Sequence, residues 1–187
     1  SGTSISNVAI VNGADDGVEF FGGTVSANDI YLENNEDDAV DWTEGWNGTL
    51  SNTYVVNTIQ GFSTSIEADG TDSNPTINNF TAISSNGGLA IQMKAASSAT
   101  INGFTATGFE TLFEFAGTSG PADLQIDGEA ANTDDDAVYA SSPTNSSDFA
   151  WATSVVEGNQ LPGNITADIT LDPSIEYTIS GPVLVNS

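Results

Sequence analysis

The 187-residue chain carries 26 acidic residues against a single basic residue, Lys94, so its formal net charge is −25 at pH 7. Nucleic acids and anionic membrane surfaces attract proteins through Lys and Arg, and both are therefore excluded as partners. The absence of Cys and His excludes disulfides, thiolate zinc sites and the commonest general base. No apolar run approaches ~18 residues, so no membrane insertion is expected.

A short motif recurs roughly every 25 residues, which is the length of one coil of a parallel β-helix. Its copies are Ser4-Ile5-Ser6, Thr24-Val25-Ser26, Thr49-Leu50-Ser51, Thr76-Ile77-Asn78 and Thr100-Ile101-Asn102. Each copy leads to a predicted bend, at Asn7, Ala27, Asn52, Asn79 or Gly103. Asn and Gly tolerate the left-handed backbone that such a bend requires.

A further strand completes each coil, with a polar residue between two apolar ones. The copies are Val18-Glu19-Phe20, Val40-Asp41-Trp42, Ile66-Glu67-Ala68, Ile91-Gln92-Met93, Phe113-Glu114-Phe115 and a fainter Val138-Tyr139-Ala140. Side chains alternate across a strand, so the outer two enter the core and the middle one faces solvent. The chain is therefore predicted to be all-β, a right-handed parallel β-helix of about six coils with a C-terminal strand extension.

The repeat weakens near residue 144, which divides the chain into three parts. Residues 1–143 hold the coils, and residues 144–164 form a linker or cap in which Phe149 and Trp151 cover the end of the β-helix. Residues 165–187 contain two more strands, placed to pair with a next unit or subunit. An apolar last strand invites such pairing. Its predicted assembly residues are Ile179, Val183, Leu184 and Val185.

Acidic residues gather around the third strand of each coil. The loops that enter it carry Asp15, Asp16, Asp37 and Asp38, and the strand itself presents a column of Glu19, Asp41, Glu67, Gln92 and Glu114. Neighbouring carboxylates repel, so the column requires bridging cations or protonation. Oxygen ligands without His or Cys select calcium as the expected cofactor.

A glycine turn with Asp69 and Asp72 is a second candidate calcium site. A solvated acidic face that serves solubility is an alternative to both sites, and the sequence leaves it open.

Two segments resemble a known repeat. These are Asp15-Asp-Gly-Val-Glu-Phe-Phe-Gly-Gly-Thr24 and Asp37-Asp-Ala-Val-Asp-Trp-Thr-Glu-Gly-Trp-Asn-Gly48. They are similar to repeats of large bacterial surface and secreted proteins with the pectate-lyase-like β-helix. The resemblance implies a secreted or cell-surface address, and adjacent repeats of the same precursor as partners. A start at Ser1, without Met or a basic leader, also favours a processed or excised part of a longer chain.

In pectate-lyase-like enzymes the polysaccharide groove lies over the third strand, where this chain has its carboxylates. Lyases of that kind need a basic residue, and the sequence offers only Lys94. The polygalacturonase-like set of Asp with His and an Arg-Lys pair is missing. A carboxylate-only glycosidase would use Glu19, Asp41 and Glu67. Carbohydrate binding would use Trp46 and Tyr54 with Asp41 and Glu67, since Trp46 is expected on an exposed loop and Trp42 in the core.

The leading hypothesis is an extracellular structural or adhesive module without catalytic residues. It would join copies of itself into a filament or surface layer, head to tail or by strand donation. The alternative is a calcium-dependent carbohydrate-binding or carbohydrate-active β-helix. Ice binding is a minor alternative, because Ser4/Ser6, Thr24/Ser26, Thr49/Ser51, Thr76/Asn78 and Thr100/Asn102 form two outward columns.

Overall fold

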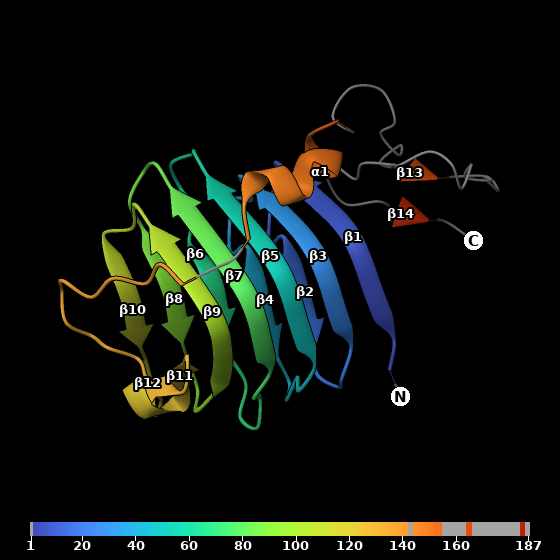
Figure 1. Cartoon of the computed structure of the whole chain (residues 1–187). Helices are drawn as coiled ribbons and strands as arrows, with labels where there is room; N and C mark the ends of the chain where they lie inside the picture. The colour runs from blue at the N-terminus through green and yellow to red at the C-terminus, as the bar shows by residue number, and fades with distance from the viewer. Residues whose placement is uncertain (1, 142–143, 155–163, 166–183, 186–187) are drawn as a thin grey trace.

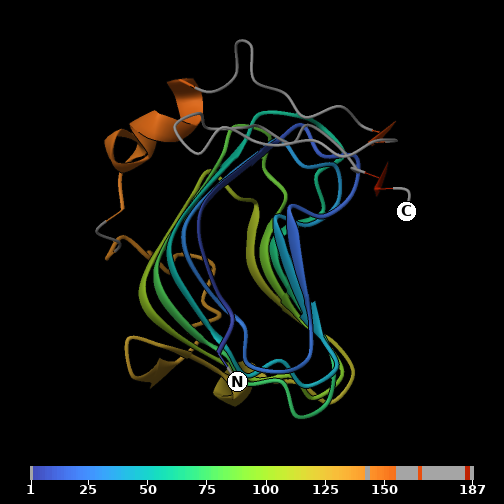
Figure 2. The same ribbon diagram turned by 90° about the vertical axis from the view of Figure 1, so that its right-hand side faces the viewer.

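The computed structural model describes residues 2–141, 144–154, 164–165 and 184–185, and its strands wind into a solenoid (Figure 1). One sheet, called sheet A, contains β1 (Ser4–Val11), β3 (Ser26–Glu33), β5 (Thr49–Asn57), β7 (Thr76–Ser84), β9 (Ala99–Thr107), β11 (Leu124–Ile126) and β12 (Glu129–Ala130). The facing sheet, called sheet B, contains β2 (Val18–Phe21), β4 (Val40–Thr43), β6 (Thr64–Ala68), β8 (Leu89–Met93) and β10 (Thr111–Phe115). Figure 2 is a view along the axis of the solenoid and shows the two sheets facing each other.

From β1 to β10, odd strands lie in sheet A and even strands in sheet B, so each of these coils contributes one strand to each sheet. Strands of successive coils pair in parallel and in register, as Val40 pairs with Val18 and then with Ile66. The predicted all-β, right-handed parallel β-helix is confirmed, with about five turns in place of six. The predicted last strand is wrong, because Val138 is 84% exposed and Ala140 makes only an isolated antiparallel bridge to Thr105.

A left-handed residue bends every sheet A strand from β1 to β9, and another directly follows β11. The bend residues are Asn7, Asp29, Asn52, Asn79, Gly103 and Asp127, with φ between 51° and 76°. The second predicted bend, at Ala27, is therefore wrong by two residues. Ala27 lies in the core and pairs with Leu50, so the second opening is Ser26-Ala27-Asn28. Asp is a residue type that tolerates the left-handed region, so the bend at Asp29 sets the register of β3. The similarity of Thr24-Val25-Ser26 to the other openings does not set it.

Amide side chains at and beside the bends connect one coil to the next. Asn52 donates from Nδ2 to the side-chain oxygens of Asn28 and Asp29, both at 3.2 Å. Asn79 in turn donates to Asn52 at 2.9 Å. These bonds run along the axis of the solenoid and therefore stabilise the stacking as well as the bend.

The core fills the space between the two sheets. Its largest fully buried side chains include Trp42, Trp46, Phe80 and Phe104. Aromatic rings stack between coils, as Phe80 lies 6.2 Å from Phe104 between ring centroids. The apolar cluster is continuous from the first coil to β11, so the solenoid has one core.

A strap crosses the outer face of sheet A. It begins at Thr144 and contains the 3₁₀ helix η2 (Ser146–Phe149) and the helix α1 (Ala150–Ser154) (Figures 1 and 2). Phe149 is buried against the stacked rings of Tyr31 and Tyr54, with ring centroids 6.1 and 5.7 Å away. Phe149 therefore covers the outside of the sheet, and the expectation that it caps the end of the β-helix is wrong. No described helix is long and apolar enough to cross a bilayer.

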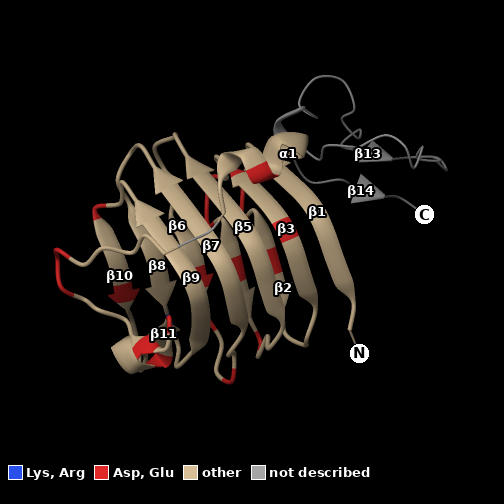
Figure 3. Ribbon diagram, viewed as in Figure 1, with Lys and Arg blue, Asp and Glu red and all other residues tan. Residues whose placement is uncertain are grey.

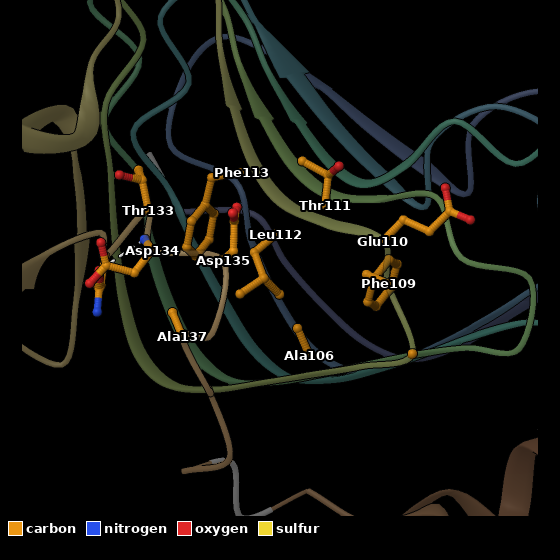
Figure 4. Close-up of a pocket in the computed structure, with 12 residues that line it drawn as sticks. Ala106, Phe109, Glu110, Thr111, Leu112, Phe113, Thr133, Asp134, Asp135 and Ala137 are labelled. Atoms are coloured by element: carbon orange, nitrogen blue, oxygen red, sulfur yellow. Dashed lines mark hydrogen bonds between the residues drawn. The ribbon is translucent and has the colours of Figure 1, made fainter.

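The residues after β10 cover the C-terminal end of the solenoid instead. The 3₁₀ helix η1 (Pro121–Asp123) leads into β11, and β12 folds back on β11 in antiparallel pairing. Tyr139 packs edge-on to Phe113 at 5.2 Å and against Phe104 at 5.4 Å. A hollow of about 360 Å³ remains between β10 and this segment, and its lining includes Leu112, Phe113, Asp134 and Asp135 (Figure 4).

Two short segments of the tail are described. β13 (Asn164–Ile165) and β14 (Leu184–Val185) pair in parallel. Leu184 and Val185 thus lie in a strand, and their role in assembly stays a prediction. Ile179 and Val183 lie outside the described residues.

Replacing Asn52 tests the bend. Asn52→Ala places alanine at a φ of 51° and removes the ladder bonds, so we expect the free energy of unfolding to fall by about 1–3 kcal/mol. Asn52→Gly loses the bonds but keeps an easy backbone, so it should lose less. Urea denaturation measures both, and equal losses would contradict a role for the left-handed backbone.

Candidate functional site

The predicted carboxylate column exists on the outer face of sheet B. Glu19 of β2 pairs with Asp41 of β4, which pairs with Glu67 of β6. Gln92 and Glu114 continue the same row on β8 and β10. Figure 3 shows the acidic positions repeating from coil to coil. The in-register parallel pairing that stacks the core therefore also stacks these charges.

The loops that enter β2 and β4 bring further carboxylates to the first two coils. Ligand atoms of Asp15, Asp16 and Asp37 lie within 4.8 Å of one another, and so do those of Asp16, Glu19 and Asp41. Asp16 belongs to both groups, which join at this residue. We call the residues Asp15, Asp16, Glu19, Asp37 and Asp41 the acidic cluster.

Burial and mutual repulsion raise two pKa values in the acidic cluster. Burial, with a contribution from Asp37, raises the pKa of Asp16 to about 6 although the Asp38 amide donates to its carboxylate. Burial also raises the pKa of Asp41 to about 7, with added repulsion from Asp16, Glu67 and Glu19. The Oδ1 atom of Asp41 is buried without a hydrogen-bond partner. Among the carboxylates of the acidic cluster, Asp41 is therefore the one that a proton or a cation would stabilise most.

Asp38 has a different place from its neighbours. Its side chain is only 4% exposed, and its Oδ1 accepts the amide hydrogen of Thr64 on the next coil at 2.8 Å. Burial raises its pKa to about 6. Asp38 joins two coils and lies outside both metal-compatible groups, unlike its predicted role as a ligand.

The second candidate calcium site lies in a turn that carries hydrogen bonds of its own. Asp69 accepts the amide hydrogen of Gly70 at 2.6 Å, and the backbone oxygen of Asp72 accepts from Asn47. Neither Asp69 nor Asp72 belongs to a group of three metal-compatible side chains among the described residues. The turn is held by its own hydrogen bonds.

The charge of the column is partly neutralised beyond the second coil. Lys94 lies 2.5 Å from Glu67 between Nζ and Oε2. Burial alone would lower the pKa of Lys94, but Glu67, Asp38 and Asp69 raise it overall. Gln92 donates to Glu114 at 2.5 Å. Uncompensated charge is therefore concentrated on the first two coils.

The predicted aromatic platform is wrong in both members. Trp46 is fully buried, stacks on Phe20 with ring centroids 4.1 Å apart, and donates its indole hydrogen to the Val25 carbonyl. The left-handed residues Glu44 and Gly45 turn the chain back toward the core just before it. Strand alternation gives no signal for this, because it stops at the end of β4.

Tyr54, the other predicted member, lies on sheet A beneath the strap and away from the carboxylate column. Trp42 is buried, as expected.

An exposed aromatic was missed. Phe21 is 65% exposed and follows Glu19 by two residues on β2, so both face outward. The sequence signal was the alternation itself, which places the second Phe of the pair Phe20-Phe21 on the solvent side.

The outward columns of sheet A are confirmed only in part. Thr49, Thr76 and Thr100 are in register, and Asn28 precedes Ser51, Asn78 and Asn102 in the second column. Thr24 lies outside β3, and Ser26 belongs to the first column, beside Ser4. Side chains of the second column hydrogen-bond to one another, as Asn102 donates to Asn78 at 3.0 Å. An ice-binding surface would need these amide groups free to contact water.

The acidic cluster predicts an unusual dependence of stability on pH. The raised pKa values mean that the folded chain binds more protons than the unfolded chain between about pH 4 and pH 7. Stability should therefore fall as pH rises through that window. We expect Tm to be lower at pH 8 than at pH 5 by about 3–6 °C.

Asp41→Asn should remove much of that dependence, and Asp134→Asn, an equal change of charge on an exposed loop, should keep it. Calorimetry at constant ionic strength measures the difference. A slope that is the same in both variants would contradict the assignment to Asp41.

Comparison with known proteins agrees with the architecture. The family model described as a pectate-lyase-like β-helix domain matches residues 1–155. No curated protein and no solved structure gives a significant match. The match covers most of the chain and the whole stack of coils, and the fold is one often found in extracellular proteins. The chain belongs to the pectate-lyase-like β-helix family.

Proposed function

We propose that this chain is an extracellular structural or adhesive module, a rod whose flat sides are its working surfaces. The observation that supports this most is the unbroken in-register ladder of sheet A from β1 to β11 around one core. Such a solenoid holds its coils at a regular spacing along its axis and tolerates variation in the length of its loops. Its strong negative charge suits an exterior rich in dissolved cations.

The state of Lys94 argues against a lyase. A lyase base must accept a proton, and the only basic side chain of the sequence is paired with Glu67 and has a raised pKa. A raised pKa keeps the ammonium protonated. Lys94 is therefore unsuited to remove a proton from a sugar ring.

A panel of neutral and acidic polysaccharides, assayed for new reducing ends and for unsaturated products, tests the proposal. A structural module should release neither. Turnover by the natural chain that is lost in Glu19→Gln or Asp41→Asn, and kept in Asp134→Asn, would overturn it.

A second candidate is calcium-dependent carbohydrate binding at the acidic cluster. Two observations favour it: the buried, unpartnered Asp41 oxygen within a group of three carboxylates, and the exposed ring of Phe21 on the same face as Glu19. A cation bound there would offset the repulsion, and an aromatic face would stack on a sugar ring. If a proton takes the place of the cation, Asp41 is the acid that a carboxylate-only glycosidase requires.

Calcium titration tests whether the acidic cluster binds a cation or whether Asp41 holds a proton instead. At pH 8 we expect millimolar Ca²⁺ to raise Tm by several degrees, since a ligand at about 100 times its Kd stabilises by ~2.7 kcal/mol. The shift should be lost in Asp41→Asn and kept in Asp134→Asn. An equal shift with Mg²⁺, or in Asp41→Asn, would indicate general screening of the charge. A glycan array with Ca²⁺ or a chelator then shows whether sugar binding follows the metal and requires Phe21.

A further inference from the structure

The hollow between β10 and the segment 132–137 has the size of a small-molecule site (Figure 4). Its volume of about 360 Å³ falls within the range of about 300–1,000 Å³ that is usual for such sites. One wall is formed by the end of β9 and the start of β10, and the other by residues 132–137. Both walls are internal segments of the chain, and the strap follows them.

Hydrogen bonds and a ring contact hold both walls in place. On the first wall, the Glu110 amide donates to the carbonyl of Gly88 on the preceding coil at 3.0 Å. On the second wall, the Asn132 amide donates to the Tyr139 hydroxyl at 2.8 Å, and Tyr139 packs edge-on to Phe113. A site whose walls are already fixed loses little conformational freedom when a ligand binds.

The lining of the hollow combines apolar side chains with carboxylates. Its partly exposed large apolar residues, which also pack against the core, are Phe109, Leu112 and Phe113. Its charged residues are Glu110, Asp134 and Asp135, and no basic residue is among the described lining. A ligand that carries a positive charge on an apolar body would complement both parts of this lining.

Neither a metal ion nor this chain itself supplies that charge well. The carboxylates of the hollow belong to none of the described groups of three whose ligand atoms lie within 4.8 Å of one another, so they are not gathered around one metal ion. Lys94 is the only basic side chain of the sequence, and it is paired with Glu67. A second copy of the chain has the same limitation. The complementary charge must therefore come from a different molecule.

We propose that this hollow binds a small organic cation, a primary amine with an aromatic or alkyl body. The ammonium group lies between Glu110 of one wall and Asp135 of the other and donates hydrogen bonds to their carboxylates. The body packs on Leu112 and Phe113 and removes their exposed apolar surface from water. An aromatic body also gains from the ring of Phe113. The ligand is bound without covalent change, at a place separate from the acidic cluster.

An NMR titration of the ¹⁵N-labelled full chain with 2-phenylethylamine tests the proposal. Salt at about 150 mM screens attraction between exposed charges beyond ~8 Å. A ligand of this size should bind with a dissociation constant on the order of 1 mM or lower, and its shift changes should be confined to residues 106–113 and 132–137. Ethylamine, which has the charge but little apolar body, and 2-phenylethanol, which has the body but no charge, should each bind at least tenfold more weakly.

A pair of double variants locates the charge that the amine requires. Glu110→Gln with Asp135→Asn removes one carboxylate from each wall and should weaken binding of 2-phenylethylamine at least tenfold. Both side chains are exposed, so the fold should be kept. Glu36→Gln with Glu44→Gln makes an equal change of charge at exposed residues of the second coil and should leave binding intact. Circular dichroism confirms folding of both.

Three results would contradict this site. Equal affinity for ethylamine and 2-phenylethylamine, or an equal loss in the two double variants, would indicate general attraction of cations to a chain of charge −25. Shift changes centred on other residues would place the amine elsewhere. Absence of saturable changes at ten times the expected dissociation constant would mean that no such site exists. Asp41→Asn should bind the amine as the natural chain does, so this result is independent of whether the acidic cluster binds calcium.

Discussion

The left-handed bend in each coil is the constraint on which the rest of the molecule depends. Because residues such as Asp29, Asn52 and Asn79 turn at the same register position, the strands on either side of them stack without slipping. A slip of one residue would exchange the inward and outward faces of a strand. The bends therefore fix the continuity of the core and, through the loops, the row of carboxylates on sheet B.

The same register that favours burial creates an electrostatic cost on the outside. Parallel in-register pairing places Glu19 beside Asp41 and Asp41 beside Glu67, with no freedom to separate them along the strand. Beyond the second coil the sequence relieves this with Lys94 and Gln92. The carboxylates of the first two coils have no such partner. Burial, together with repulsion from its neighbours, accordingly raises the pKa of Asp41. The carboxylates of the first two coils are therefore the part of the row that a proton or a cation would stabilise most.

Much of the architecture could be predicted because strand alternation and coil length are local properties of the sequence. The third-strand column, for example, follows from one polar residue between two apolar ones, as in Val40-Asp41-Trp42. The predictions failed where the backbone departs from the two-residue alternation of a strand. Trp46 enters the core through two left-handed residues, Tyr54 is covered by a strap from residue 144 onward, and Tyr139 caps an end without being a strand. Each depends on contacts between distant parts of the chain.

The strap has a consequence for cooperativity. In a solenoid each repeat contacts only its neighbours, so unfolding can begin at a terminal coil and proceed coil by coil. Phe149 packs on Tyr31 and Tyr54, while Val11 of β1 belongs to the same cluster. The strap thus acts as a cross-link over three coils. Fraying of the first coil must then disturb the third, and the N-terminal half should melt as one unit rather than as a series of layers.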